Sequence, residues 1–226
     1  MTDAEFRTVS VTLPPHGRQG LLGLPTSPAG IVLFAHGSGS SRFSPRNRFV
    51  AEALQRAGLA TLLFDLLTED EAAHRANVFD IAHLAERLDQ AASWVGDSTV
   101  VQSLPLGFFG ASTGAAAALA AASGLTDVRA IVSRGGRPDL AGDTLTKVSA
   151  ATLLIVGSDD PEVLALNRTA YRQLHCERRL EVVPGSAHLF EEPGTREAVV
   201  ALGRAWFLRH LTTPAAERGR AIHRPA

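Results

Sequence analysis

Ser112 lies in a Gly-Ala-Ser-Thr-Gly segment, residues 110–114, between an apolar run and an alanine-rich run. A strand that turns sharply into a helix needs small residues around the turn, and this segment supplies them. Such a turn lifts the serine hydroxyl above the edge of a sheet, where the dipole of the following helix favours negative charge. The pattern predicts that Ser112 is a nucleophile. The alternative is a tight packing turn that carries an incidental serine.

His188 is the predicted base, because a serine hydroxyl is a weak nucleophile without one. It lies in a loop directly after the last predicted strand, where a side chain can lean over the carboxyl edge of the sheet. His36 precedes a Gly/Ser-rich loop and is expected to be structural. Other histidines fall in helix patterns, near a helix end or in a charged loop and are expected on the surface: His74, His83, His175 and His210.

Asp159 and Asp160 follow a strand-like run and supply the acid that would orient His188. Asp160 is favoured because it stands three residues after Gly157 and ahead of a helix, as the acid does in comparable enzymes. Asp159 is the alternative. Aspartate also caps helices that begin with proline, so one of the pair is predicted to cap the helix near Pro161 while the other serves His188.

The oxyanion of an acyl-transfer reaction needs backbone N–H donors. We expect one from Thr113, directly after the nucleophile, and one from Ser38 in the loop after the run IVLFAHG, with Gly39 as second choice. Gly39, Arg42 and Arg134 are the candidate substrate-binding residues, since arginine recognises carboxylate or phosphate with two-pronged geometry. The alternative for these arginines is a salt bridge to Asp65, Asp139 or Glu191.

Five short apolar runs do not alternate polar with apolar residues, which predicts strands covered on both sheet faces: 31–36, 60–65, 105–110, 129–134 and 152–157. A further strand is predicted at 179–185. Helix-period segments lie between them, at about 45–57, 78–95, 113–123, 162–174 and 195–210. The first 25 residues predict an antiparallel hairpin. The order predicts a mostly parallel, doubly wound α/β sheet. No insertion is long enough for a cap domain, so we expect a shallow, open pocket.

The bulk composition favours one domain over residues 1–211, with a flexible tail at 212–226. The net charge of −1 and the lack of a basic cluster argue against a nucleic-acid partner. No apolar run approaches the ~18 residues of a membrane span, and no secretory signal is recognisable, so the cytosol is the expected compartment. Cys176 is the only cysteine and Lys147 the only lysine. A multi-cysteine zinc site is therefore excluded, and we expect neither metal nor cofactor.

The segments HGSGSSR, GASTGAAAAL, SRGGRPDL, LLIVGSDD and HLFEEPG resemble the dienelactone hydrolase-like family of α/β-hydrolases, over roughly residues 20 to 211. The resemblance implies an α/β-hydrolase fold and hydrolysis of an ester or lactone through an acyl-enzyme intermediate. It implies a small-molecule substrate and no cofactor. This chain carries a serine where true dienelactone hydrolases carry a cysteine, and it lacks their acidic residue after FAHG. Some relatives in this serine-bearing subgroup are fused to phosphoribosyltransferase domains.

Two other classes of function compete with the hydrolase. A binding or interaction module could retain the same scaffold without catalysis, since fold does not fix function. The loop HGSGSSR could also cradle a phosphate, although it lacks the spacing of a dinucleotide or P-loop fingerprint. The chain order serine, acid, histidine favours the hydrolase. The sequence does not indicate an oligomeric state.

Overall fold

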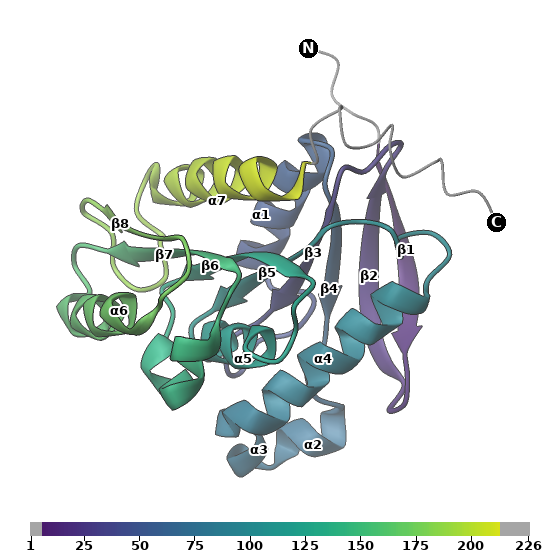
Figure 1. Cartoon of the computed structure of the whole chain (residues 1–226), viewed down its shortest axis with the longest axis horizontal. Coiled ribbons are helices and arrows are strands. Elements are labelled where there is room, and N and C mark those ends of the chain that lie inside the picture. The colour runs from purple at the N-terminus through teal and green to yellow at the C-terminus, as the bar shows by residue number, and fades with distance from the viewer. Residues whose placement is uncertain (1–5, 213–226) are drawn as a thin grey trace.

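Strands from the whole chain form one eight-stranded sheet with helices on both faces in the computed structural model, which describes residues 6–212 (Figure 1). The strands lie in the order β1-β2-β4-β3-β5-β6-β7-β8. Their bounds are β1 Phe6–Leu13, β2 Arg18–Pro25, β3 Ile31–Ala35, β4 Ala60–Phe64, β5 Leu106–Ala111, β6 Val128–Arg134, β7 Ala151–Gly157 and β8 Arg178–Val183.

The hairpin β1–β2 is antiparallel and joins the sheet through β2, which pairs antiparallel with β4. All pairs from β4 to β8 are parallel. Parallel strands place their carboxyl ends at one edge, so the loops after β3, β5, β6, β7 and β8 can meet there. This edge holds the candidate site.

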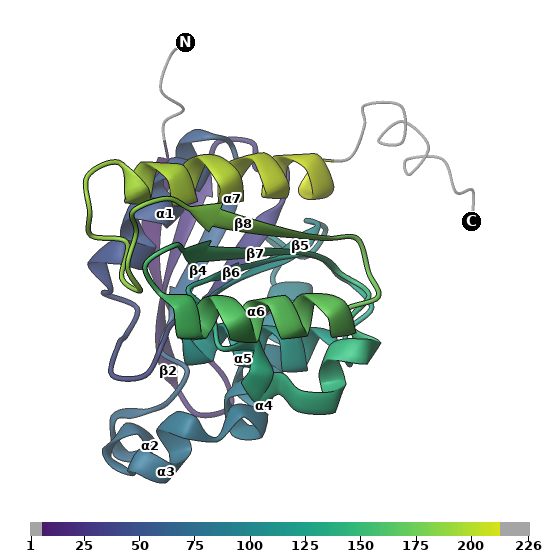
Figure 2. The same ribbon diagram turned by 90° about the vertical axis from the view of Figure 1, so that its left-hand side faces the viewer.

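Helices cover the two sheet faces as separate layers (Figures 1 and 2). The helices are α1 Pro45–Arg56, α2 Glu69–Ala73, α3 Arg75–Phe79, α4 Ile81–Asp97, α5 Thr113–Ala122, α6 Pro161–Gln173 and α7 Thr195–Leu211, with a 3-10 segment at Pro138–Lys147. Helices α1 and α7 pack on one face, and α4, α5 and α6 lie on the other (Figure 2). Two apolar clusters result, one on each side of the sheet.

Alternating strand residues supply these two clusters. In β3, Ile31, Leu33 and Ala35 belong to the core under α4 and α5. Val32 and Phe34 belong to the core under α1 and α7. All five are nearly inaccessible to water, which explains why the run has no polar alternation.

The structure confirms the predicted mostly parallel sheet with helices on both faces, and shows no large cap within residues 6–212. Two short helices, α2 and α3, and the 3-10 segment were not predicted. The predicted tail lies outside the described residues from position 213 onward. Between residues 6 and 212, no helix combines the length and apolarity that crossing a membrane requires.

Candidate active site

Ser112 connects β5 to α5 with φ 51° and ψ −122°, a backbone conformation that non-glycine residues rarely adopt. Its N–H donates to the Arg134 carbonyl at 3.3 Å, and its carbonyl accepts from the Arg137 N–H at 3.1 Å. These bonds to the end of β6 hold the strained turn. Strain of this kind costs on the order of 1–3 kcal/mol and clusters at functional sites.

Gly110 and Gly114 allow the turn to be this tight. A Cβ at Gly114 would lie closer than 3.0 Å to the carbonyl oxygens of Ala35 and His36. A Cβ at Gly110 would lie equally close to the backbone of Ala115. Because backbone atoms cannot swing away, both positions require glycine.

His188 lies in the loop between β8 and α7, and its Nδ1 is 2.7 Å from Asp160 Oδ2. The Asp160 side chain is 15% exposed and that of His188 is 39% exposed. A carboxylate at Nδ1 fixes the proton there and leaves Nε2 without a proton, available to accept one. The pair can therefore act as an oriented base.

Asp160 also caps α6, because its Oδ1 accepts from the Val163 N–H at 3.4 Å. The prediction that one aspartate caps while the other contacts the histidine was therefore wrong. A carboxylate has two oxygens, and Asp160 uses one for each partner. Asp159 instead accepts from the Ser158 hydroxyl at 2.8 Å and is exposed.

Phe190 anchors the loop that carries His188. Its ring is buried, and its backbone has φ 55°, the other positive value for a non-glycine residue besides Ser112 within the described range 6–212. The imidazole lies next to Gly135, where a Cβ would be 3.6 Å from His188 Cε1 and 3.1 Å from the His188 carbonyl oxygen. Gly135 directly follows Arg134, the last residue of β6, whose carbonyl accepts from the Ser112 N–H.

Ser112 and His188 line one pocket of about 200 Å³ at the carboxyl edge of the sheet. Ser112 is half-buried, so its side chain is not sealed inside. In the described part of the chain, no hydrogen bond joins Ser112 Oγ to the His188 ring. Such bonds are often long until substrate is present.

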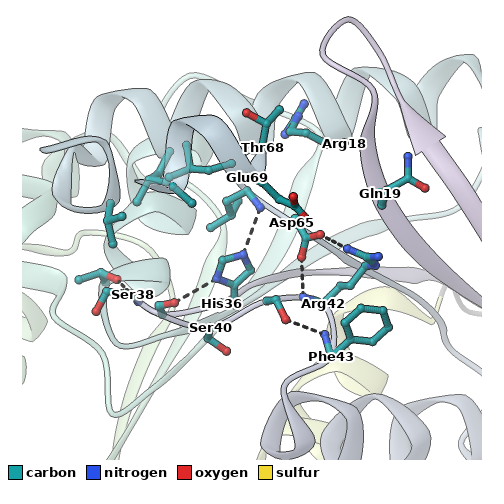
Figure 3. A pocket seen from close by; sticks show the side chains of 18 of the residues that line it. Arg18, Gln19, His36, Ser38, Ser40, Arg42, Phe43, Asp65, Thr68 and Glu69 are labelled. Atoms are coloured by element: carbon teal, nitrogen blue, oxygen red, sulfur yellow. Dashed lines mark hydrogen bonds and ion pairs between the residues drawn. The ribbon is translucent and has the colours of Figure 1, made fainter. Parts of the chain in front are cut away.

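Ser38 and Thr113 meet beside this pocket, as predicted from their positions in the chain. The Ser38 N–H, however, donates to Thr113 Oγ1 at 3.0 Å (Figure 3). The Thr113 N–H is the first amide of α5 and has no carbonyl partner within the helix. Gly37 packs against the elbow, since a Cβ there would lie 3.2 Å from Ser112 Cβ.

A larger pocket of about 490 Å³ adjoins the smaller one and shares Gly37, Ser38 and Ser40 with it (Figure 3). Its walls come from the 37–43 loop, the hairpin β1–β2, and the segment from Asp65 through α2 and α3 to α4. The absence of a large cap was predicted, but this pocket was not. The two short helices, which carry no extended apolar period, build a wall that the sequence did not reveal.

The predicted substrate-binding arginines differ in their partners. Arg42 forms an ion pair with Asp65, which also accepts from the Arg42 N–H at 2.8 Å (Figure 3). Asp65 was one of the carboxylates named as the alternative partner. Arg42 lines the larger pocket, whereas Arg134 lines the smaller one with Ser112 and His188. Gly39 lies in the loop after β3 with φ 69°, and a Cβ at this position would have no atom within 4 Å.

Arg134 forms no salt bridge within residues 6–212, and its Nε is buried without a hydrogen-bond partner there. Burial, together with repulsion from Arg46 and Arg196, lowers its pKa to about 10. Arg134 therefore stays charged at neutral pH. Arg46 and Arg196 share one exposed carboxylate, Glu191, at 3.0 and 3.9 Å.

His36 ties two loops together. Its Nε2 accepts from the Leu66 N–H at 3.1 Å, so Nδ1 carries the proton and donates to the Gly37 carbonyl at 3.0 Å (Figure 3). Burial lowers the pKa of His36, which keeps the ring neutral. These bonds fit the structural role expected for it. Over residues 6–212, no group of three His, Cys, Asp or Glu side chains is arranged to hold a metal ion.

Comparison with solved structures decides the family. The chain is 51% identical to a dienelactone hydrolase from Anabaena variabilis, with a TM-score of 0.87, and the match covers 92% of this chain and 99% of that one. This chain belongs to the dienelactone hydrolase-like family of α/β-hydrolases. A carboxyl esterase from Tuber melanosporum shares the fold at 18% identity, with a TM-score of 0.72 and coverage of 93% of this family member and 89% of the esterase. No family model matches the sequence.

Two Mycobacterium tuberculosis proteins provisionally named phosphoribosyl transferases are 56% identical to this family member over 215 residues. The match covers 95% of the chain but 48% of each relative. The chain thus spans about half the length of the curated relatives that it matches.

Several residues of the site were not identified from the sequence. Phe190 has no sequence signal, because positive φ at a phenylalanine depends on tertiary packing. Ser40 and Leu189 line the smaller pocket from loops, and Ser44 and Asn47 line it from the N-terminal end of α1. The 37–48 segment, rich in Ser and Arg after a strand, was the one signal that could have pointed to Ser40, Ser44 and Asn47.

Proposed function

We propose that this protein is a serine hydrolase that cleaves a carboxylic ester or lactone through an acyl-enzyme intermediate. One observation carries the proposal: Ser112, in a strained turn, shares a pocket with His188, whose Nδ1 is 2.7 Å from Asp160. The family relationship supports the same class of reaction.

In the proposed mechanism, Ser112 Oγ attacks the carbonyl carbon while His188 Nε2 takes the hydroxyl proton. Asp160 holds the imidazole in the required tautomer and stabilises the imidazolium. His188 then gives the proton to the departing oxygen, and the acyl group remains on Ser112. A water molecule, activated by His188, attacks the acyl-enzyme and releases the acid.

The N–H groups of Thr113 and Ser38 are the proposed oxyanion donors. The Ser38 N–H now donates to Thr113 Oγ1. We propose that it shares its hydrogen with the oxyanion in the tetrahedral state, as bifurcated donors do at helix ends. Removing one such donor from an oxyanion hole costs about 10²–10³ in kcat.

Arg134 is the proposed contact for an anionic group on the substrate, because it is the arginine of the smaller pocket that lacks a carboxylate partner within the described residues. Arg42 is paired with Asp65 and lines the larger pocket, and Gly39 lines neither pocket, so we propose no anion contact for either of them. Arg134→Gln should lower kcat/KM for a carboxylated ester and leave its neutral analogue unchanged. Arg48→Gln, an exposed position on α1 outside the pocket, is the control with the same loss of charge. If Arg134→Gln lowered kcat/KM equally for both esters, the proposed anion contact would be contradicted.

Hydrolysis assays on 4-nitrophenyl esters and simple lactones test the reaction class. The wild type should hydrolyse at least one of them, and Ser112→Ala and His188→Ala should each lose at least about 10⁴-fold in kcat. If both variants kept the wild-type rate, the activity would lie elsewhere. If no ester or lactone were hydrolysed, the non-catalytic binding module would be favoured.

The name of the curated relatives raises a second activity, phosphoribosyl transfer. This chain matches about half of those proteins. We propose that the half matched here supplies the hydrolase. Incubation of this chain with phosphoribosyl pyrophosphate and free nucleobases should yield no nucleotide, and nucleotide formation would contradict this division.

A further inference from the structure

Two pockets meet at the Gly37–Ser38 segment. Gly37, Ser38 and Ser40 line both of them. The smaller pocket holds Ser112 and His188, and the larger one reaches Thr113, the neighbour of the nucleophile. A substrate carbonyl placed between Ser112 and the Thr113 amide therefore lies at the junction of two spaces with different walls.

The chemistry of ester cleavage assigns the two spaces. The tetrahedral carbon carries the Ser112 oxygen, the oxyanion, the departing oxygen and the acyl substituent. The departing oxygen must face His188, which protonates it, and His188 lines only the smaller pocket. The oxyanion faces the Ser38 and Thr113 amides. The larger pocket, which Thr113 and the Gly37–Ser38 segment also line, is then the space available to the acyl substituent.

We propose that the larger pocket is an acyl-binding site for a mostly apolar acyl chain well beyond acetyl in size. This inference rests on the proposed hydrolase function. The volume of about 490 Å³ falls within the range of small-molecule sites. The wall is largely apolar: Phe43, Leu66, Leu67, Ala72, Val78 and Leu84.

Two arginines line this pocket, and only one of them is paired with a carboxylate: Arg18 forms no ion pair within residues 6–212, and its buried Nε has no hydrogen-bond partner there. Arg42 is paired with Asp65, and the buried Arg18 donates to the Arg87 carbonyl and to Gln90. Glu69 is exposed.

Helix α2 offers a matched pair of positions for a test. Ala72 and Ala73 are neighbours and both exposed, but only Ala72 lines the pocket. The helix is fixed by the capping box of Thr68 and Glu71, and Glu71 accepts from Arg87 at 2.5 Å. A tryptophan at position 72 would extend into the pocket, and one at position 73 would not.

The experiment measures kcat/KM for 4-nitrophenyl acetate, butyrate, hexanoate and octanoate, in which the leaving group is constant. For the wild type, kcat/KM should rise by up to about fourfold for each added methylene, the value of full burial of that group. Ala72→Trp should abolish the rise and keep acetate within about twofold of wild type. Ala73→Trp should behave like wild type throughout. Val78→Trp, on α3, repeats the test if Ala72→Trp does not fold.

The outcomes separate the inference from the function on which it rests. A wild type that hydrolyses acetate but shows no gain with chain length overturns the acyl-site assignment alone. The assignment is likewise overturned if Ala72→Trp and Val78→Trp both show the same dependence of kcat/KM on chain length as the control Ala73→Trp. A wild type that hydrolyses none of these esters or simple lactones overturns the proposed function, and the acyl site with it.

Discussion

Asp160 combines two tasks that the sequence suggested for two residues. One carboxylate oxygen orients His188 and the other caps α6. The capping bond also fixes the position of the Asp160 carboxylate, so that its other oxygen stays in contact with the imidazole. A residue that both stabilises and positions must be tested with a substitution that removes only one role.

Asp160→Asn removes the charge at His188 but keeps a good helix cap, since asparagine caps as well as aspartate. In the trypsin triad, which is the worked example behind this estimate, the same change lowers kcat about 10⁴-fold because the histidine adopts the wrong tautomer. We expect a loss of about 10³–10⁴ in kcat here, with the urea midpoint nearly unchanged. Asp159→Asn, one position earlier, should leave kcat within about twofold. Equal losses in the two variants would contradict the assignment of Asp160.

Reasoning from the sequence was most successful for residues whose positions follow from chain order. Ser112, Asp160 and His188 follow β5, β7 and β8 of one parallel stretch of sheet, and such strands bring their loops to one edge. The hydrogen-bond and ion-pair partners of flexible side chains could not be predicted from chain order. Nothing in the sequence separates Arg42, which finds Asp65, from Arg134, which finds no carboxylate among the described residues.

At the scale of elements, the β5–α5 turn depends on backbone contacts that no side chain can relieve. Gly114→Ala should lower the free energy of unfolding by about 3 kcal/mol, because the new Cβ would overlap carbonyl oxygens at the end of β3. Gly96→Ala is the control: Gly96 is exposed in α4 with open space around it. That change should raise the free energy of unfolding by up to about 1 kcal/mol. Urea unfolding measures both, and equal values would contradict the packing argument.

Helix α2 is held by a carboxylate whose titration can be followed. Burial alone raises the pKa of Glu71, but hydrogen bonds from the Thr68 N–H and from Arg87 outweigh it and lower the pKa to about 2. The ionised form therefore stabilises the fold above pH 4.5, and this stabilisation is lost as the pH falls toward 2. Glu71→Gln should be less stable than wild type at pH 7, and the difference should shrink at lower pH. A difference independent of pH would exclude the charge as its cause.

The sequence predicted elements well where hydrophobic pattern and length agree. The strands from β3 to β8 and the long helices were found close to their predicted bounds. Helices α2 and α3 have five residues each, too short to show an apolar period. Helix α2 is held by its capping box and by the contact of Glu71 with Arg87, which are far apart in the chain, and α3 has no side-chain cap.

At the scale of the whole molecule, one sheet separates two apolar clusters. We expect them to unfold together, as the predicted single domain requires, because each strand from β3 to β7 contributes to both. Trp94 on α4 and Trp206 on α7 report the two faces separately. In Trp94→Phe and in Trp206→Phe, the urea midpoint from the remaining tryptophan should equal that from far-UV circular dichroism of the same variant. A fluorescence midpoint that departs from the circular dichroism midpoint in either variant would indicate separate units.

Labelling with a fluorophosphonate tests the central claim most directly, because the reagent reacts with an activated serine hydroxyl and needs no knowledge of the substrate. Intact mass and peptide mapping of the wild type should show one label, on the peptide that contains Ser112. The label should be absent from Ser112→Ala and strongly reduced in His188→Ala. Labelling of Ser112→Ala to the wild-type extent, or a label located on another serine such as Ser38 or Ser158, would contradict the account.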